Sequence, residues 1–292
     1  MQTDFLSTEN IPLSEVQHPL LKQHQIKLFV KRDDLIHPFI SGNKWRKLKY
    51  NIEEMKRQEK TGMLTFGGAY SNHILAVAAA GNKSGFKTAG IIRGEEAREN
   101  NPLLKKVKAL GMQLQFISRE EYRKKAAREF LAALQKDFPG FYIVPEGGAN
   151  KLGVQGCKEI VGEITMDYTH VCCCCGTGTT LAGIAMSLSP GEKAIGFCVH
   201  KGGKTVEQNV LRWTSGATNF SVINDYHFGG FAKSTQELNA FAREFSAATK
   251  IPVEPVYTAK MFYGIFDLIR KGFFKPGSVL VAIHTGGIHN YL

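Results

Sequence analysis

The stretch GMLTFGGAYSNHILAVAAAG, from Gly62 to Gly81, predicts a strand, a turn and a helix in direct succession. Its opening residues form a short apolar run of the kind found in buried strands, and Gly67 and Gly68 follow as the turn. The run from Ile74 to Ala80 is apolar on all sides and suits a buried helix. A strand that leads through a glycine turn into a helix is the repeating piece of a parallel sheet.

The same alternation of short apolar runs and helical patterns continues along the chain in two series. It predicts an α/β fold with two domains, each with a central, mostly parallel sheet flanked by helices. Two domains are expected because 292 residues exceed the size at which one core usually stops growing. Further strands are predicted at 88–92, 113–117, 141–144, 169–175, 194–199 and 278–284, and helices at 102–110, 120–136, 160–164 and 181–188.

Targeting and membrane segments are not evident in the sequence. The N-terminal residues MQTDFLSTENIPLSEV lack the basic and then apolar regions of a secretory signal. No run reaches the roughly 18 apolar residues that span a bilayer. We therefore expect a cytoplasmic protein without a membrane partner.

Four of the six cysteines are consecutive, from Cys172 to Cys175. This spacing differs from the disulfide framework of a small secreted domain. It also differs from zinc sites, which use Cys-x-x-Cys pairs, because neighbours in a strand point to opposite faces. We interpret the run as small apolar residues of a buried strand, and we expect no metal site.

The formal net charge of +11 raises the hypothesis of a nucleic-acid or anion binder without catalytic activity. The basic residues are scattered, however, and in the segment 120–130 acidic residues stand among them, as on a solvated helix face. No nucleic-acid-binding module is recognisable. We attribute the charge to solubility, with some attraction for anionic substrates and cofactors, and expect no nucleic-acid partner.

Lys44 lies in the stretch ISGNKWRKL, after a Gly-Asn turn and before a predicted helix with apolar anchors at Trp45 and Leu48. A lysine is ordinarily a solvated surface residue. A lysine partly withdrawn from water loses its proton more easily, and a neutral amine is what Schiff-base formation requires.

Two glycine-rich turns are candidates for anion binding. In GGAYSNH, from Gly67 to His73, a helix begins where small residues let a ligand approach, although Ser71 and Asn72 are also ordinary helix caps. In CGTGTTLAG, from Cys175 to Gly183, a strand leads into a loop of glycines and threonines. This loop is neither a Walker loop nor a dinucleotide fingerprint, and a single phosphate suits it better than a pyrophosphate.

Taken together, the motifs resemble the fold-type II enzymes that depend on pyridoxal 5′-phosphate (PLP). Within these enzymes, they resemble the group of 1-aminocyclopropane-1-carboxylate (ACC) deaminases and D-cysteine desulfhydrases. The resemblance runs from Val30 to the C-terminus and is carried by KRDDL (31–35), SGNKWRKL (41–48), GGAYSNH (67–73), GTGTTLAG (176–183), PVYTAKM (255–261) and HTGG (284–287).

The resemblance implies a tryptophan-synthase-β-like architecture and a homodimer. The larger, PLP-binding domain would comprise 1–49 and 151–292, and the smaller domain 50–150. Lys44 would hold PLP as a Schiff base and move the α-proton, Ser71 would receive the substrate carboxylate, and Tyr257 would act as an acid–base or orienting phenol. The other residues implied to bind PLP are Asn72 at its 3-hydroxyl, Gly176, Thr177, Gly178, Thr179 and Thr180 at its phosphate, and Thr258 and Thr285 near its ring nitrogen.

Thr258 and Thr285 separate the two activities of the group. The deaminase pattern has a glutamate at the first position and a leucine at the second, whereas the desulfhydrase pattern has hydroxyl residues at both. A carboxylate at the ring nitrogen would keep it protonated and strengthen the electron sink, which ring opening without an α-proton needs more than thiolate elimination does. The sequence therefore favours a D-cysteine desulfhydrase, with ACC deaminase or another small D-amino-acid deaminase as the alternative. Phe231 stands where the family pattern has a tyrosine that stacks on the substrate.

Overall fold

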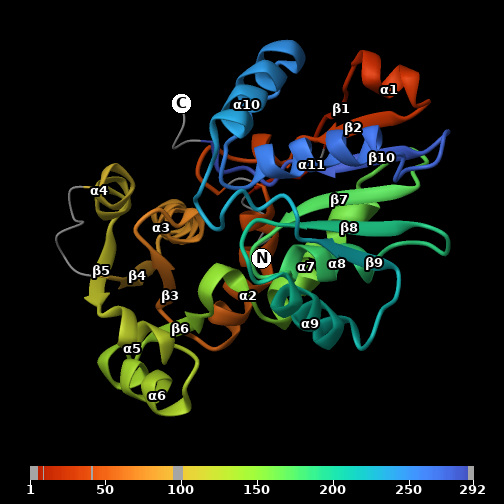
Figure 1. Cartoon of the computed structure of the whole chain (residues 1–292). Coiled ribbons are helices and arrows are strands. Elements are labelled where there is room, and N and C mark those ends of the chain that lie inside the picture. Colours follow the sequence, from red (N-terminus) through yellow and green to blue (C-terminus); the bar gives the residue numbers. More distant parts are fainter. Residues whose placement is uncertain (1–5, 9, 41, 95–100, 289–292) are drawn as a thin grey trace. The chain divides into compact units, whose positions relative to one another are not determined.

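The computed structural model describes residues 6–8, 10–40, 42–94 and 101–288, and the chain forms two compact units (Figure 1). The small unit comprises Lys44–Gly153 together with the described residues before Thr8. The large unit comprises Thr8–Asn43 and the chain from Val154 onward. No helix in the described ranges is long and apolar enough to cross a membrane.

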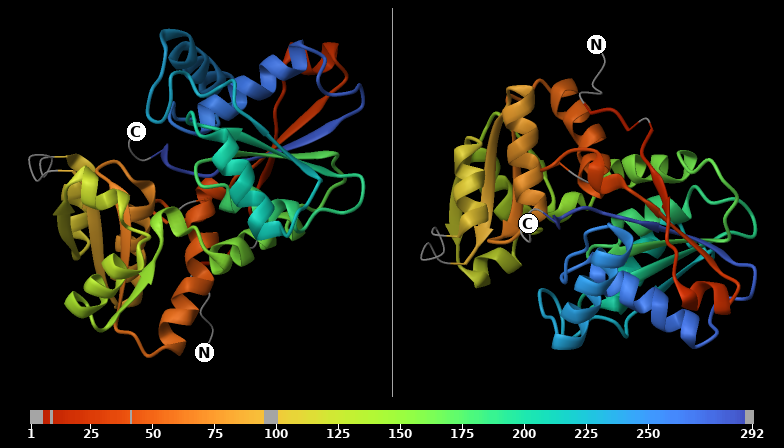
Figure 2. Two further views of the ribbon diagram at one scale, coloured as in Figure 1. Left: turned by 60° about the horizontal axis from the view of Figure 1, so that its bottom comes forward. Right: turned by 90° about the horizontal axis from the view of Figure 1, so that it is seen from above.

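The small unit contains a four-stranded sheet in the order β5-β4-β3-β6, with all neighbours parallel. Helix α3 packs on one face, where a Cβ on Gly90 would lie 3.4 Å from the Ile74 side chain, and Figure 2 shows α3 running beside the strands. Leu64 and Phe66 pack on the opposite face against Tyr122 and Leu134. The elements are α2 Asn43–Arg57, β3 Gly62–Gly68, α3 Asn72–Ser84, β4 Lys87–Arg93, α4 Pro102–Ala109, β5 Met112–Ile117, α5 Arg119–Arg123, α6 Arg128–Asp137 and β6 Phe141–Val144.

The large unit contains a six-stranded sheet in the order β1-β2-β10-β7-β8-β9, in which β1 alone runs antiparallel to its neighbour. The short apolar strands at its centre are covered on both faces, as parallel sheets require. Its elements are β1 Leu13–Glu15, α1 Pro19–Gln23, β2 Lys27–Lys31, α7 Lys151–Gly162, β7 His170–Cys175, α8 Thr179–Ala185, β8 Lys193–Cys198, α9 Gly203–Thr214, β9 Phe220–Ile223, α10 Gln236–Thr249, α11 Thr258–Arg270 and β10 Val279–Ile283.

The cysteine run forms most of β7, and all four side chains are buried. Cys172 and Cys174 join the core cluster that includes Phe262 and Ile265 of α11, whereas Cys173 and Cys175 join the cluster on the other face. Neighbouring thiols therefore point in opposite directions, as expected for a strand. Burial raises the pKa of Cys172 to about 12. The prediction of a buried strand is confirmed.

The α/β class and the predicted strands are confirmed, with ends that shift by one or two residues. Three predictions of local structure were wrong. The helix predicted at 160–164 instead spans Lys151–Gly162 as α7. The helix predicted over 120–136 is two helices, α5 and α6, of which α5 is closed at its start by a capping box between Ser118 and Glu121. Lys44 lies within the first turn of α2, since the helix already begins at Asn43.

Candidate active site

The residues predicted to hold the phosphate follow β7, the strand of the large sheet at which the strand order reverses. From β7 the chain proceeds to β8 and β9 on one side, whereas β10 pairs with β7 on the other side (Figure 1). In open α/β sheets, ligands bind at the carboxyl ends of the strands beside such a switch point. Gly176 to Thr180 follow β7, and the HTGG motif follows β10. The two motifs therefore meet at the edge where a ligand is expected.

The loop from Gly176 to Thr180 has a backbone conformation that requires a glycine at position 178. Gly178 has φ of +88°, and a Cβ there would lie 3.1–3.2 Å from Val206 and Val210. The hydroxyls of Thr177 and Thr179 are 2.9 Å apart. A loop with this conformation presents backbone N–H groups and hydroxyls together, which is the donor set that a phosphate requires. The residues present therefore fit the phosphate of PLP.

The residues just before Lys44 pack against both of these loops within the large unit. The Asn43 side-chain amide donates to the Thr180 hydroxyl at 2.8 Å. Gly42 has φ of +59°, and a Cβ there would lie 2.0 Å from the carbonyl oxygen of Thr285. Lys44 is the next residue along the chain. The fold thus brings together three motifs that are far apart in the sequence.

Tyr257 lies beside the predicted phosphate loop. A Cβ on Gly176 would lie 3.7 Å from Cε1 of the Tyr257 ring and 4.0 Å from its hydroxyl oxygen. The same ring packs edge-on against Phe231, with 5.8 Å between the ring centres. The phenol predicted to face the substrate therefore has the phosphate loop on one side and Phe231 on the other.

Thr258 is fully buried at the start of α11, where it contacts Glu254. The Thr258 hydroxyl accepts from the Glu254 N–H at 2.9 Å and lies 3.3 Å from the Glu254 carboxylate. That carboxylate accepts from the N–H groups of Val256, Tyr257 and Thr258. Burial raises the pKa of Glu254 to about 7, against the opposing effect of these N–H donors. Sequence reasoning missed Glu254, although an acid inside the apolar stretch IPVEPVY was a usable signal.

Thr285 is buried after β10, and its hydroxyl lies 2.9 Å from the Cys174 thiol. His284 beside it is also buried, and its Nε2 lies 2.7 Å from the carbonyl oxygen of Pro252. Burial lowers the pKa of His284, although the nearby Asp34 carboxylate works in the opposite direction. These contacts hold the HTGG motif next to the segment that carries Tyr257 and Thr258.

In the small unit, Ser71 and Asn72 follow β3, which is the switch point of that sheet because β4 and β6 pair with β3 on opposite sides. The Ser71 hydroxyl caps α3 and accepts from the N–H of Ile74 at 3.3 Å, and Asn72 is the first residue of the helix. The helix-capping interpretation of Ser71 is therefore confirmed. Because the Ser71 hydroxyl is engaged in the cap, the backbone N–H groups at the start of α3 are the further candidates for binding a carboxylate.

Lys44 also belongs to the small unit, where its charge acts on His73. His73 is buried, and its Nε2 lies 2.9 Å from the Thr65 hydroxyl. Burial holds the pKa of His73 well below its usual value, and the positive charges of Lys44 and Lys47 lower it further. Burial and the Lys44 charge therefore both disfavour protonation of the His73 imidazole.

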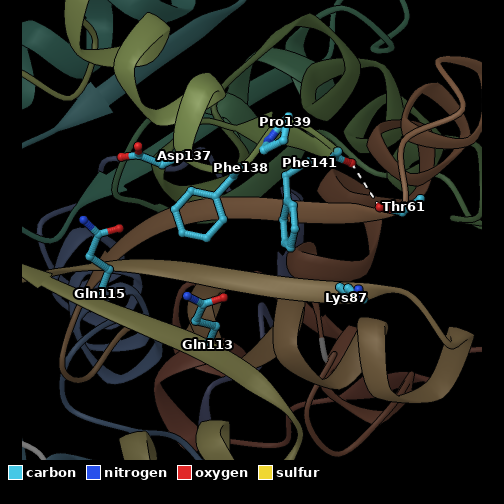
Figure 3. Close-up of a pocket in the computed structure, with 9 residues that line it drawn as sticks. Thr61, Lys87, Gln113, Gln115, Asp137, Phe138, Pro139 and Phe141 are labelled. Carbon is cyan, nitrogen blue, oxygen red and sulfur yellow. Dashed lines mark hydrogen bonds between the residues drawn. The ribbon is translucent and has the colours of Figure 1, made fainter.

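A pocket of about 580 Å³ lies in the small unit at the opposite edge of the sheet (Figure 3). Thr61, Lys87, Gln113 and Phe141 line it at the amino ends of the parallel strands. None of the predicted site residues is among those that line it. Its position is that of a structural hollow rather than of the ligand edge of a parallel sheet.

Comparison with known proteins decides the family. The model of the family described as "Pyridoxal-phosphate dependent enzyme" matches residues 6–286. This chain belongs to that family. A putative ACC deaminase of Pyrococcus furiosus is 32% identical over 280 residues, covering 89% of this chain and 84% of the relative. A bifunctional D-cysteine desulfhydrase/ACC deaminase of Arabidopsis thaliana is 29% identical, covering 90% of this chain and 72% of the relative.

The solved structures agree with this family and with its fold. An ACC deaminase homologue superposes with a TM-score of 0.81 at 28% identity, covering 98% of this chain and 93% of that one. Threonine deaminase isoform 2 of Solanum lycopersicum matches with a TM-score of 0.68 at 18% identity, covering 98% of this chain and 81% of that chain, and shows the fold alone. The predictions of an enzyme, of PLP as its cofactor and of the fold-type II architecture are confirmed.

Proposed function

We propose that this PLP-dependent enzyme is a lyase that acts on D-cysteine. D-cysteine and water would give pyruvate, ammonia and sulfide. The observation that supports this substrate is the pair of buried hydroxyl residues, Thr258 and Thr285. At these two positions the ACC deaminase pattern has a glutamate and a leucine. Thr258 and Thr285 hydrogen-bond to the Glu254 N–H and to the Cys174 thiol, so a neutral hydroxyl occupies each of these two positions.

We assign the following roles to the residues of this chain. When bound, PLP supplies an electron sink for the electrons of the α-carbon. The Lys44 amine attaches the cofactor and takes the α-proton. The loop Gly176–Thr180 holds the phosphate. Asn72 binds the 3-hydroxyl of the cofactor, the capped turn at Ser71 binds the substrate carboxylate, and Tyr257 orients the departing sulfur.

The experiment that tests the substrate is a panel of D-cysteine, L-cysteine, D-serine and ACC. We expect pyruvate and sulfide from D-cysteine and little or no 2-ketobutyrate from ACC. L-cysteine serves as the control for stereochemistry. The specific alternative is ACC deaminase, which is favoured by the name of the Pyrococcus furiosus relative. Efficient release of 2-ketobutyrate from ACC, with D-cysteine inert, would replace the proposed activity by that alternative.

The phosphate assignment has its own test. Replacing Thr179 and Thr180 together with alanine is expected to weaken retention of PLP by about 1–3 kcal/mol, because hydroxyl donors to the phosphate are lost. Cofactor dissociation is measured by the visible absorbance that remains after gel filtration. Thr214→Ala is the matched control, since the Thr214 hydroxyl bonds to the carbonyl of Val210 within its own helix. Unchanged dissociation in the double variant would place the phosphate elsewhere.

A further inference from the structure

Lys260 is a fully buried lysine on α11, one turn from Tyr257, and the roles assigned above leave it unused. Its ammonium donates to three backbone carbonyls, at 3.2 Å to Val199, 2.9 Å to His227 and 2.9 Å to Gly230. Val199 follows β8, and the other two acceptors lie in the segment between β9 and α10. One cation therefore joins α11, the end of β8 and this segment.

The segment 227–233, which we call the Phe231 loop, has an unfavourable backbone. Phe228 and Ala232 have φ of +50° and +55°, and Gly229 and Gly230 between them have φ of +90° and +126°. Side chains with a Cβ rarely adopt positive φ, so such a conformation persists only where the surroundings hold it. The Phe228 ring holds one end by packing edge-on against Tyr263, 5.0 Å away. Lys260 bonds to His227 at the start of the loop and to Gly230, the residue before Phe231.

The hydrogen bonds inside the Phe231 loop close its own turns. The Gly230 N–H donates to the carbonyl of His227 at 3.0 Å, and the Lys233 N–H donates to the carbonyl of Gly230 at 3.2 Å. The bonds from Lys260 instead tie the loop to α11 and to β8. Burying a lysine is costly unless its donors are satisfied, and here the three carbonyls satisfy all three donors of the ammonium.

Phe231 is the exposed end of this arrangement. Phe231 is 45% exposed, and its ring contacts Tyr257. Tyr257 in turn lies beside Gly176 of the loop to which we assign the cofactor phosphate. An aromatic ring held at this place forms an apolar wall next to the phenol.

We propose that Lys260 is a positioning residue that sets how strictly the enzyme discriminates the size of the β-substituent of its substrate, by holding Phe231 against Tyr257. The inference rests on the proposed lyase function. With the loop held, the wall leaves room for a thiol. With the loop released, a longer sulfur substituent fits as well. Lys260 acts through Phe231 and does not itself contact the substrate.

Burial lowers the pKa of Lys260 to about 8, whereas the charges of Glu254 and Cys198 oppose this effect. The ammonium also interacts with His200, whose pKa is raised overall by its hydrogen bond to Cys198 and is opposed only in part by the Lys260 charge. The ammonium has three protons for its three carbonyl acceptors. As the pH rises through this pKa the amine becomes neutral and has two protons, so one of the three bonds is lost.

The test compares Lys260→Met with Lys271→Met, a matched control because Lys271 ends the same helix in an exposed position. The substrates are D-cysteine and S-methyl-D-cysteine, which is larger by one carbon. In Lys260→Met we expect the kcat/KM for D-cysteine divided by that for S-methyl-D-cysteine to fall about tenfold or more. This is the usual effect of one methyl group in an apolar pocket. In Lys271→Met the ratio should stay at its wild-type value.

A double-mutant cycle separates positioning from a general loss of structure. Phe231→Ala should lower the same ratio, and adding Lys260→Met to Phe231→Ala should change it no further, because both act through one ring. Additive effects on the ratio would overturn the proposal. A lysine that served only the stability of the fold would lower kcat for both substrates and leave the ratio unchanged.

A second readout requires no catalytic activity. In the cofactor-loaded protein, tryptic cleavage after Lys233, relative to cleavage after Lys250, should rise severalfold in Lys260→Met. If that variant does not fold, wild-type protein provides the same test, since relative cleavage after Lys233 should rise between pH 7 and pH 9.5. Unchanged cleavage would overturn the role of Lys260 even where D-cysteine is the substrate. Inert D-cysteine with increased cleavage would instead overturn the proposed function and leave the anchoring intact.

Discussion

Lys44→Ala is expected to reduce turnover of every amino acid in the panel to background while the protein remains folded. Removal of a positioned proton-transfer group costs on the order of 10²–10⁴-fold in rate, and the loss of the covalent attachment to the cofactor adds to this. The fold should survive because Lys44 is only partly buried, and the neighbouring Asn43 keeps its hydrogen bond to Thr180. Pyruvate release and thermal unfolding are the two measurements.

The matched control for Lys44→Ala is Lys56→Ala. Lys56 lies in the last turns of the same helix and is exposed. Its variant should keep the wild-type rate and the wild-type visible spectrum. Borohydride reduction of the wild-type protein should fix the chromophore to the peptide that contains Lys44. Near wild-type pyruvate release by Lys44→Ala would assign the attachment and the proton transfer to another residue.

Thr258→Glu combined with Thr285→Leu is expected to lower pyruvate release from D-cysteine by about tenfold or more, which corresponds to ~1.4 kcal/mol of transition-state stabilisation. The leucine removes the hydroxyl that meets the Cys174 thiol. The glutamate introduces a second carboxylate beside buried Glu254, and two like charges at this distance cannot both ionise easily. A change of substrate is distinguished from misfolding by 2-ketobutyrate release from ACC, which is measured in parallel and is expected to rise.

The contribution of Glu254 to this result can be measured separately. Adding Glu254→Gln to Thr258→Glu removes the competing carboxylate and keeps an oxygen that accepts from the N–H groups at the start of α11. We expect this combination to recover thermal stability that Thr258→Glu alone loses. If Thr258→Glu and Thr285→Leu leave the D-cysteine activity unchanged, the two threonines do not decide the substrate.

Strand β9 was not predicted, but seven other parallel strands were predictable because each is a short apolar run. Strand β2 was not, because lysines occupy both of its ends, Lys27 and Lys31. Lys31 can be buried only because Asp33 and Glu163 pair with it. Glu163 lies 132 residues further along the chain, and no local pattern reveals that pairing.

The candidate site shows the same division between local and distant information. The Gly176–Thr180 loop was recognisable from its glycines and hydroxyls. The contact between Asn43 and Thr180 joins residues 137 positions apart and follows from the order of the strands in the sheet. Glu254 and Lys260 were missed because an isolated charged residue is ordinarily a surface residue. Their burial became evident only once α11 was packed against the sheet.

All six thiols of the protein are buried, and all six belong to the large unit. A thiol reagent in solution reaches a buried cysteine when the surrounding structure opens, so the rate of labelling follows the free energy of that opening. The small unit contributes no cysteine to the signal. Labelling kinetics of the unmodified protein therefore report on the opening of the large unit by itself, without any engineered probe, and the four thiols of β7 report on the centre of its sheet.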